Sequence, residues 1–157
     1  MPKLIKQGQF VDNPWLVVEK GAANISENFS LVHLRDWEIA SQSGKTCGLW
    51  LSADDTLEQL PAGFKNLAVI AINFPAFMDG RGFSLARQLR EQKDYQGEVR
   101  AIGQFFQDQT LMMKRCGFDA FLVPDDADLN SYKMTLGFFT DYYQAAVDEP
   151  RPLFRRR

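Results

Sequence analysis

The apolar run from Leu67 to Ile72 constrains the fold more than any other segment of the chain. It reads Leu-Ala-Val-Ile-Ala-Ile, with no alternation between apolar and polar positions. A strand with one face in water alternates, whereas a strand covered on both faces does not. The run therefore predicts the central strand of a parallel sheet in an α/β domain.

Further strand-then-helix units surround this run. The patterns predict strands over residues 48–51, 97–102 and 118–123, and helices over 52–60, 83–92, 105–116 and 128–136. Short turns between such units favour parallel strands with right-handed crossovers. A closed eight-stranded barrel typically needs about 250 residues, and this chain has 157. We expect a small parallel sheet of four to five strands, half-barrel-like in a TIM-like or Rossmann-like manner.

The first 46 residues are less regular. The elements expected there are strands over residues 15–19 and 31–34, antiparallel if they pair, and a short helix over 36–41. We predict one domain over residues 1–149, with an irregular part at 1–46 and strand–helix units at 47–149. Residues 138–144 fit a helix or a strand equally well.

Residues 150–157 form a tail of different composition, with four arginines and no acidic residue. The chain has 18 Lys and Arg against 20 Asp and Glu, a charge of −2, so residues 1–149 hold 14 against 20, a charge of −6. A basic tail beside an acidic body can fold back, pair with a second subunit or dock a partner. A disordered end is the alternative.

The scarcity of cysteine and histidine excludes several kinds of chemistry. Cys47, Cys116 and His33 cannot complete a zinc site of four ligands or a cluster held by four thiolates. His33 lies in an apolar run, which favours a structural histidine over a catalytic base, and the cysteines are expected to be reduced and mostly buried. We expect no metal site and no intrinsic cofactor. Flavin and nicotinamide stay open, although no loop has their fingerprint.

The charge balance and the hydropathy pattern bear on partners and location. A net charge of −2 argues against nucleic acid as the partner. No window approaches the roughly 18 apolar residues of a membrane span, and residues 1–10 do not resemble a signal sequence. We expect a soluble, cytoplasmic protein that contacts no membrane.

The candidate site lies beyond the carboxyl ends of the predicted strands, where parallel sheets bind ligands. The loops after Ile72, Ile102 and Val123 are expected to meet there. The segment Asp79-Gly-Arg-Gly-Phe-Ser84 is the most informative, because its glycines let a ligand approach the backbone and the Arg81 fork fits phosphate, sulfate or carboxylate. The alternative is a tight turn in which Arg81 pairs with Asp79 or a neighbouring loop. The predicted ligand-binding residues are Gly80, Arg81, Gly82, Ser84 and Gln109.

Asp79 and Asp108 are the candidate catalytic residues. Either carboxylate could transfer a proton while Arg81 holds an anionic substrate. The alternative for Asp108 is stabilisation of a helix N-terminus. Asp126, Asp128 and Asn130 resemble the start of a calcium loop, but the glycine and glutamate that such a loop requires are missing, so helix capping by Asp128 is expected instead.

Several long motifs resemble the bacterial domain-of-unknown-function family 934. They are Asn73-Phe-Pro, Asp79-Gly-Arg-Gly-Phe-Ser-x-Ala-Arg87, Gly97-Glu-x-Arg-Ala101, Asp108-Gln109, Arg115-Cys-Gly-Phe-Asp-Ala120, Tyr143-Gln144 and Pro152-Leu-Phe-Arg-Arg156. The resemblance implies small cytoplasmic proteins often encoded beside sulfite reductase, some labelled oxidoreductases. It therefore implies a link to assimilatory sulfur metabolism without a defined reaction. Carried onto this chain, the family pattern falls on Asp79, Gly80, Arg81, Gly82, Arg100, Gly103, Asp108, Gln109, Arg115, Cys116, Gly117 and Asp119.

Three hypotheses for the function follow. The first is an accessory or binding protein that holds a small oxyanion or an acidic partner segment, with sulfite reductase or another sulfur-assimilation protein as partner. The second is an enzyme, of oxidoreductase or lyase/isomerase type, acting on a small anionic metabolite through Arg81 with Asp79 or Asp108. The third is a homodimeric module that associates through the aromatic C-terminal segment and the arginine tail.

Overall fold

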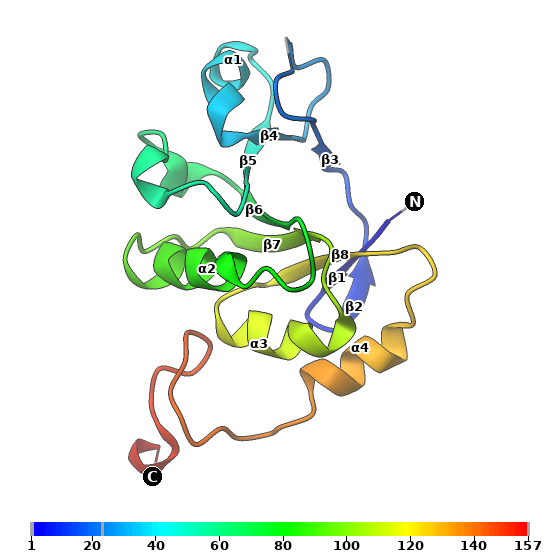
Figure 1. Ribbon diagram of the computed structural model, residues 1–157, viewed down its shortest axis with the longest axis vertical. Helices are drawn as coiled ribbons and strands as arrows, with labels where there is room; N and C mark the ends of the chain where they lie inside the picture. The colour runs from blue at the N-terminus through cyan, green and yellow to red at the C-terminus, as the bar shows by residue number, and fades with distance from the viewer. Residues whose placement is uncertain (1, 23, 157) are drawn as a thin grey trace.

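The computed structural model describes residues 2–22 and 24–156. Within this part of the chain, eight strands form one sheet in the order β2-β1-β8-β7-β6-β5-β4-β3 (Figure 1). The strands are β1 Lys3–Lys6, β2 Gln9–Val11, β3 Leu16–Val17, β4 Ser30–His33, β5 Cys47–Leu51, β6 Val69–Phe74, β7 Glu98–Gly103 and β8 Ala120–Val123.

The sheet is an open half-barrel whose parallel strands follow one another in chain order. The six strands from β3 to β8 run parallel to one another. β1 is antiparallel to β8, and β2 is antiparallel to β1. The prediction of a parallel sheet with four to five strands is therefore wrong in two respects: the sheet has eight strands among the described residues, and β1 and β2 pair in antiparallel fashion. The hairpin was missed because β2 has only three residues, all of them exposed, and therefore shows no apolar run. The expected antiparallel pairing of the first strands is also wrong, since Leu16 lies opposite Ser30 in a parallel register.

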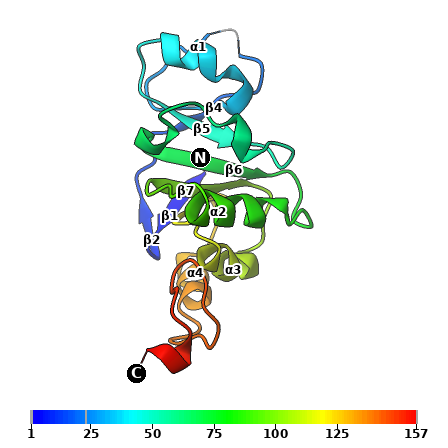
Figure 2. The same ribbon diagram turned by 90° about the vertical axis from the view of Figure 1, so that its left-hand side faces the viewer.

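The helices are short except for the one that follows the central strand. They are α1 Trp37–Gln42, α2 Arg81–Glu91, α3 Thr110–Arg115 and α4 Leu129–Leu136. Figure 2 shows α2 in front of β6 and β7. In the described ranges, no helix is both long and apolar enough to cross a bilayer. Asp128 caps α4 as expected, accepting the backbone N–H groups of Asn130 and Ser131.

The helix expected over residues 52–60 is only a 3₁₀ turn, Leu57–Gln59. The Asp55 carboxylate accepts hydrogen bonds from both the backbone N–H and the hydroxyl of Ser52, at 2.7 and 2.8 Å. These bonds close a tight turn just after β5, and Pro61 follows soon after the short helical segment. The capping pattern therefore marks a turn, because too few residues remain to extend a helix.

The central strand is buried on both faces, as its lack of alternation predicts. Ile70 and Ile72 pack on the side that carries Leu85 and Leu89 of α2. Alternate residues of β6 face a second cluster that includes Trp15. The strand continues to Phe74, so Asn73 lies in the strand and not in the loop where it was expected.

After α4 the chain runs through residues 137–156, which we call the C-terminal arm. Residues 138–152 contain no helix or strand, which answers the question left open for 138–144, and one 3₁₀ turn follows at Leu153–Arg155. Arg156 turns back onto the arm, donating to the carbonyl oxygens of Arg151 and Tyr142 and pairing with Asp141 at 3.2 Å. The described part of the tail therefore folds back on its own arm, which projects away from the sheet (Figure 1).

Candidate functional site

The Arg81 guanidinium lies at the carboxyl edge of the parallel strands and is held by two carboxylates. Its Nη2 is 2.6 Å and its Nε is 3.0 Å from Asp79, which also accepts the backbone N–H of Arg81 at 3.1 Å. Its Nη1 pairs with Asp54, from the loop after β5. The turn therefore has the geometry of the alternative considered for it, in which Arg81 joins neighbouring loops.

These contacts decide the protonation of Asp79. Hydrogen bonds from the Arg81 side chain and backbone lower the pKa of Asp79 to about 2. At neutral pH this carboxylate is ionised and a weak base, which makes it a poor proton acceptor. The Asp79 side chain is 14% exposed and Asp54 is 82% exposed, so Asp54 is the partner that an incoming anion could replace.

The two glycines of this turn have different environments. A Cβ on Gly82 would lie 2.6 Å from the Phe74 ring, so Gly82 lets α2 pack closely on β6. A Cβ on Gly80, the residue before α2, would meet nothing within 4 Å. Ser84 is exposed in the first turn of the helix. Of the predicted backbone contacts, only Gly80 leaves open space for a ligand.

Gln109 joins two loops of the same edge. Its Nε2 donates to the carbonyl oxygen of Phe77 and its Oε1 accepts the N–H of Phe106, both at 2.9 Å. The two aromatic rings are 4.6 Å apart and both are exposed. Asp108 is separate from this group: it is exposed and lines a shallow pocket beside Tyr143 of the arm. The two candidate catalytic residues therefore have different neighbours: Asp79 contacts Arg81, and Asp108 lies beside the arm.

His33 has the structural role expected for it. Its Nδ1 accepts the N–H of Arg35 at 3.1 Å, and its Nε2 lies 3.0 Å from the Asp55 carboxylate. The ring is fully buried against Trp50, and burial lowers the pKa of His33. The Ser52 hydroxyl donates to Asp55 at 2.8 Å and lies 3.4 Å from His33 Nε2, so the three side chains form one local network.

Neither cysteine has the features of an activated thiol. Cys47 and Cys116 are free thiols, and burial raises the pKa of each above its ordinary value. Both are therefore protonated at neutral pH, in which form a thiol is a weak nucleophile. The described residues contain no group of three or more His, Cys, Asp or Glu side chains able to hold a metal ion.

Arg115 attaches the C-terminal arm to the body. Its Nη2 donates to the Gln144 carbonyl oxygen at 2.7 Å, its Nη1 lies 3.3 Å from Asp148, and its guanidinium carbon lies 3.8 Å from the centroid of the Tyr142 ring. The arm also exposes large aromatic side chains. They are Phe138 (72%), Tyr143 (69%), Phe154 (62%) and Phe139 (52%).

A groove at the amino ends of β7 and β8, opposite the edge that holds Arg81, was not predicted from the sequence. Its lining includes Lys6, Lys114 and Lys133, which lie far apart in the sequence and belong to no motif. Gly117 and Asp119 of the family pattern also line it. These two positions of the family pattern could have indicated the groove. The prediction followed instead the rule that parallel sheets bind ligands beyond the carboxyl ends of their strands, which is the opposite edge.

A family model described as "Bacterial protein of unknown function (DUF934)" matches residues 48–154. The match begins in β5 and ends in the arm, so it includes α2, Arg115 and most of the groove lining. Neither the curated proteins nor the solved structures contain a match to this chain.

Proposed function

We propose that this chain, which belongs to the DUF934 family of bacterial proteins of unknown function, is a cytoplasmic accessory protein of assimilatory sulfite metabolism. In this role it binds a partner protein, sulfite reductase or another enzyme of the same route, and does not itself transform a substrate. The C-terminal arm is the docking surface.

The observation that carries this proposal is the composition of the arm. Protein interfaces are enriched in exposed aromatic and arginine side chains, and a few such residues supply most of the binding energy. The arm presents Phe138, Tyr143 and Phe154 together with the exposed Arg151 and Arg155. The arm has three arginines and three carboxylates, but one carboxylate, Asp148, is paired with Arg115 of the body. The remaining balance is positive by one charge, so a segment with acidic and apolar side chains is the complementary partner surface.

Arg81 offers a second contact for the same kind of partner. Its pair with Asp54 is exposed, and solvent screening leaves exposed pairs with little effect on stability. A carboxylate of the partner, or a small oxyanion, can replace Asp54 while Asp79 keeps the guanidinium oriented. The low pKa of Asp79 favours this binding role over the enzyme alternative.

The test is co-purification of the full chain with sulfite reductase at moderate salt. The arm variant is Phe138→Ala/Tyr143→Ala/Phe154→Ala, and the matched control is Phe10→Ala/Phe29→Ala, two exposed phenylalanines outside both the arm and the Arg81 edge. We expect the arm variant to lose the partner and the control to keep it. No association at any salt concentration, or equal association of both variants, would refute the proposal.

The contribution of Arg81 is tested separately by thermal melting with sulfate, sulfite and phosphate. Arg87, six residues along α2, is as exposed as Arg81 and pairs with Glu91 at 3.1 Å, so Arg87→Ala is the control. Stabilisation by these anions that is lost in Arg81→Ala and kept in Arg87→Ala supports the second contact. An unchanged melting temperature of the unmodified protein with all three anions removes it.

A further inference from the structure

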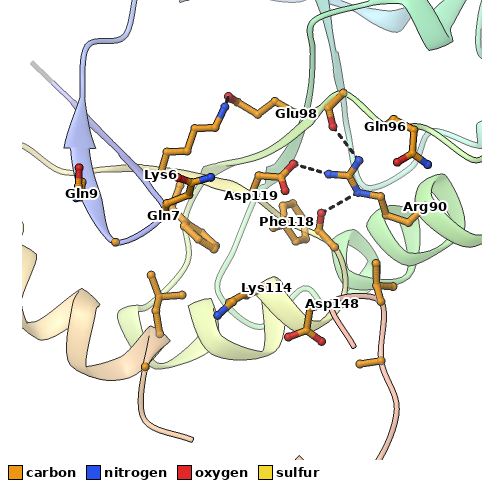
Figure 3. A pocket seen from close by; sticks show the side chains of 18 of the residues that line it. Lys6, Gln7, Gln9, Arg90, Gln96, Glu98, Lys114, Phe118, Asp119 and Asp148 are labelled. Atoms are coloured by element: carbon orange, nitrogen blue, oxygen red, sulfur yellow. Dashed lines mark hydrogen bonds and ion pairs between the residues drawn. The ribbon is translucent and has the colours of Figure 1, made fainter. Parts of the chain in front are cut away.

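The groove at the amino ends of β7 and β8 has a volume of about 1170 Å³. Figure 3 shows Lys6 and Gln7 on one side, Arg90 and Gln96 on another, and Lys114 below them. The walls come from the β1–β2 turn, the carboxyl-terminal ends of α2, α3 and α4, and residues 146–150 of the arm. Pockets for small molecules have volumes of about 300–1,000 Å³, so this groove has room for a ligand of nucleotide size.

Each of the four carboxylates that line the groove already has a basic partner. Asp119 pairs with Arg90 and also accepts the N–H of Val99 at 3.0 Å. Glu98 lies 2.8 Å from the Lys6 ammonium and 2.7 Å from the buried Arg100. The other two pairs are Glu91 with Arg87 and Asp148 with Arg115.

The lysines of the groove are not neutralised in this way. Lys114 and Lys133 are exposed and make no ion pair or side-chain hydrogen bond with any residue in the described ranges 2–22 and 24–156. Lys6 shares the single charge of Glu98 with Arg100. The lining itself has four basic side chains and four carboxylates, but Arg87, Arg100 and Arg115, which lie outside the lining, also pair with these carboxylates. Counted with these partners, seven basic groups stand against four acidic ones, so the local charge is positive although residues 1–149 as a whole have a charge of −6.

The helix dipoles explain why basic residues lie at the ends of α3 and α4, but they do not explain why both lysines border the same groove. Lys114 and Lys133 lie in the last turns of α3 and α4, where a cation stabilises the helix. An ammonium group can do this from any side of the helix end. Here both lysines border one groove, beside the largely apolar side chains of Phe118, Phe121 and Leu136.

We infer that this groove binds a small organic anion. The anionic group, a phosphate, sulfonate or carboxylate, lies toward Lys114 and Lys133, where an ammonium group donates charge-assisted hydrogen bonds. The apolar body lies toward Phe118 and Val147. Lys6 and Arg90 are positioning residues, since their contacts with Glu98 and Asp119 hold the walls.

The experiment uses the full chain and the fluorescent probe 8-anilinonaphthalene-1-sulfonate, an aromatic sulfonate. Its binding is compared in the unmodified protein, in Lys114→Ala/Lys133→Ala, and in Lys20→Ala/Lys45→Ala, which removes two exposed lysines that do not line the groove. We expect roughly tenfold weaker binding in the first variant, about the loss of one charge-assisted hydrogen bond. The control is expected to bind as the unmodified protein does.

The exposed aromatics of the arm could also bind this probe, so the same comparison is repeated in Phe138→Ala/Tyr143→Ala/Phe154→Ala. If probe binding to the arm variant still depends on Lys114 and Lys133, the probe binds in the groove. The uncharged N-phenyl-1-naphthylamine should bind more weakly, and adenosine monophosphate should displace the sulfonate with an affinity that falls as salt rises. Equal affinity in the two lysine variants, or equal binding of the charged and uncharged probes, would overturn the inference.

Discussion

Replacement of Arg115 by alanine should detach the C-terminal arm from the body without unfolding the sheet. The guanidinium donates to the Gln144 carbonyl oxygen, pairs with Asp148 and stacks on Tyr142. The side chains of Arg115 and Asp148 are only 11% and 21% exposed, so solvent screens their pair only in part. The core of the sheet contains none of these groups, so its packing is preserved.

The expected magnitude follows from these contacts. A hydrogen bond to a charged group contributes ~1.5–3 kcal/mol, and a cation–π contact ~0.5–2 kcal/mol. With each of these partly exposed contacts taken at the low end of its range, the attachment amounts to roughly 3 kcal/mol. Since every 1.4 kcal/mol is tenfold, the open population of the arm should rise by about two orders of magnitude.

Limited proteolysis with chymotrypsin measures this population at Tyr142, because its half-buried ring packs under the Arg115 guanidinium and is freed when the arm opens. Cleavage at Phe138, Phe139 and Tyr143, which are already exposed, serves as the internal reference. Cleavage follows the open population when opening and closing are fast. Arg87→Ala, which removes an exposed pair with Glu91, is the control and should be cut at the original rate. Equal cleavage of Arg115→Ala and the unmodified protein would show that Arg115 does not attach the arm.

Three further predictions concern stability. Gly103→Ala should cost roughly 2–4 kcal/mol in urea denaturation, because φ is +91° and the new Cβ would lie 2.4 Å from the Phe74 carbonyl oxygen; Gly80→Ala, with open space around it, should change stability by less than about 0.5 kcal/mol. Burial lowers the pKa of His33, the chain's single histidine, so below about pH 6.5 the unfolded state binds a proton that the folded state does not. The free energy of unfolding should therefore fall as the pH drops through this range, and His33→Gln should remove that slope. Asp128→Ala should cost ~1 kcal/mol by loss of the α4 cap, and an unchanged urea midpoint would contradict it.

The strand–helix units could be predicted from sequence because they depend on local patterns. The run at 67–72 is apolar on both faces, Asp128 supplies a side-chain cap, and Gly117 and Gly137 end their helices, so each signal lies within its own element. The β1–β2 hairpin had no such signal, because its strands are short and β2 is exposed. Its place in the sheet depends on pairing with β8, from the far end of the chain.

The candidate sites depended still more on tertiary contacts. The position of Arg81 beside a turn and the basic character of the tail could be inferred from the amino-acid sequence, since both are properties of single segments. The pairing of Arg81 with Asp54 and Asp79, and the contact of Arg115 with the arm, depend on how distant segments pack together. The tertiary structure also brings Lys6, Lys114 and Lys133 to the border of one groove. The physical reason is that ion pairing and groove formation join side chains from distant segments, and their partners are set by how strands and helices pack.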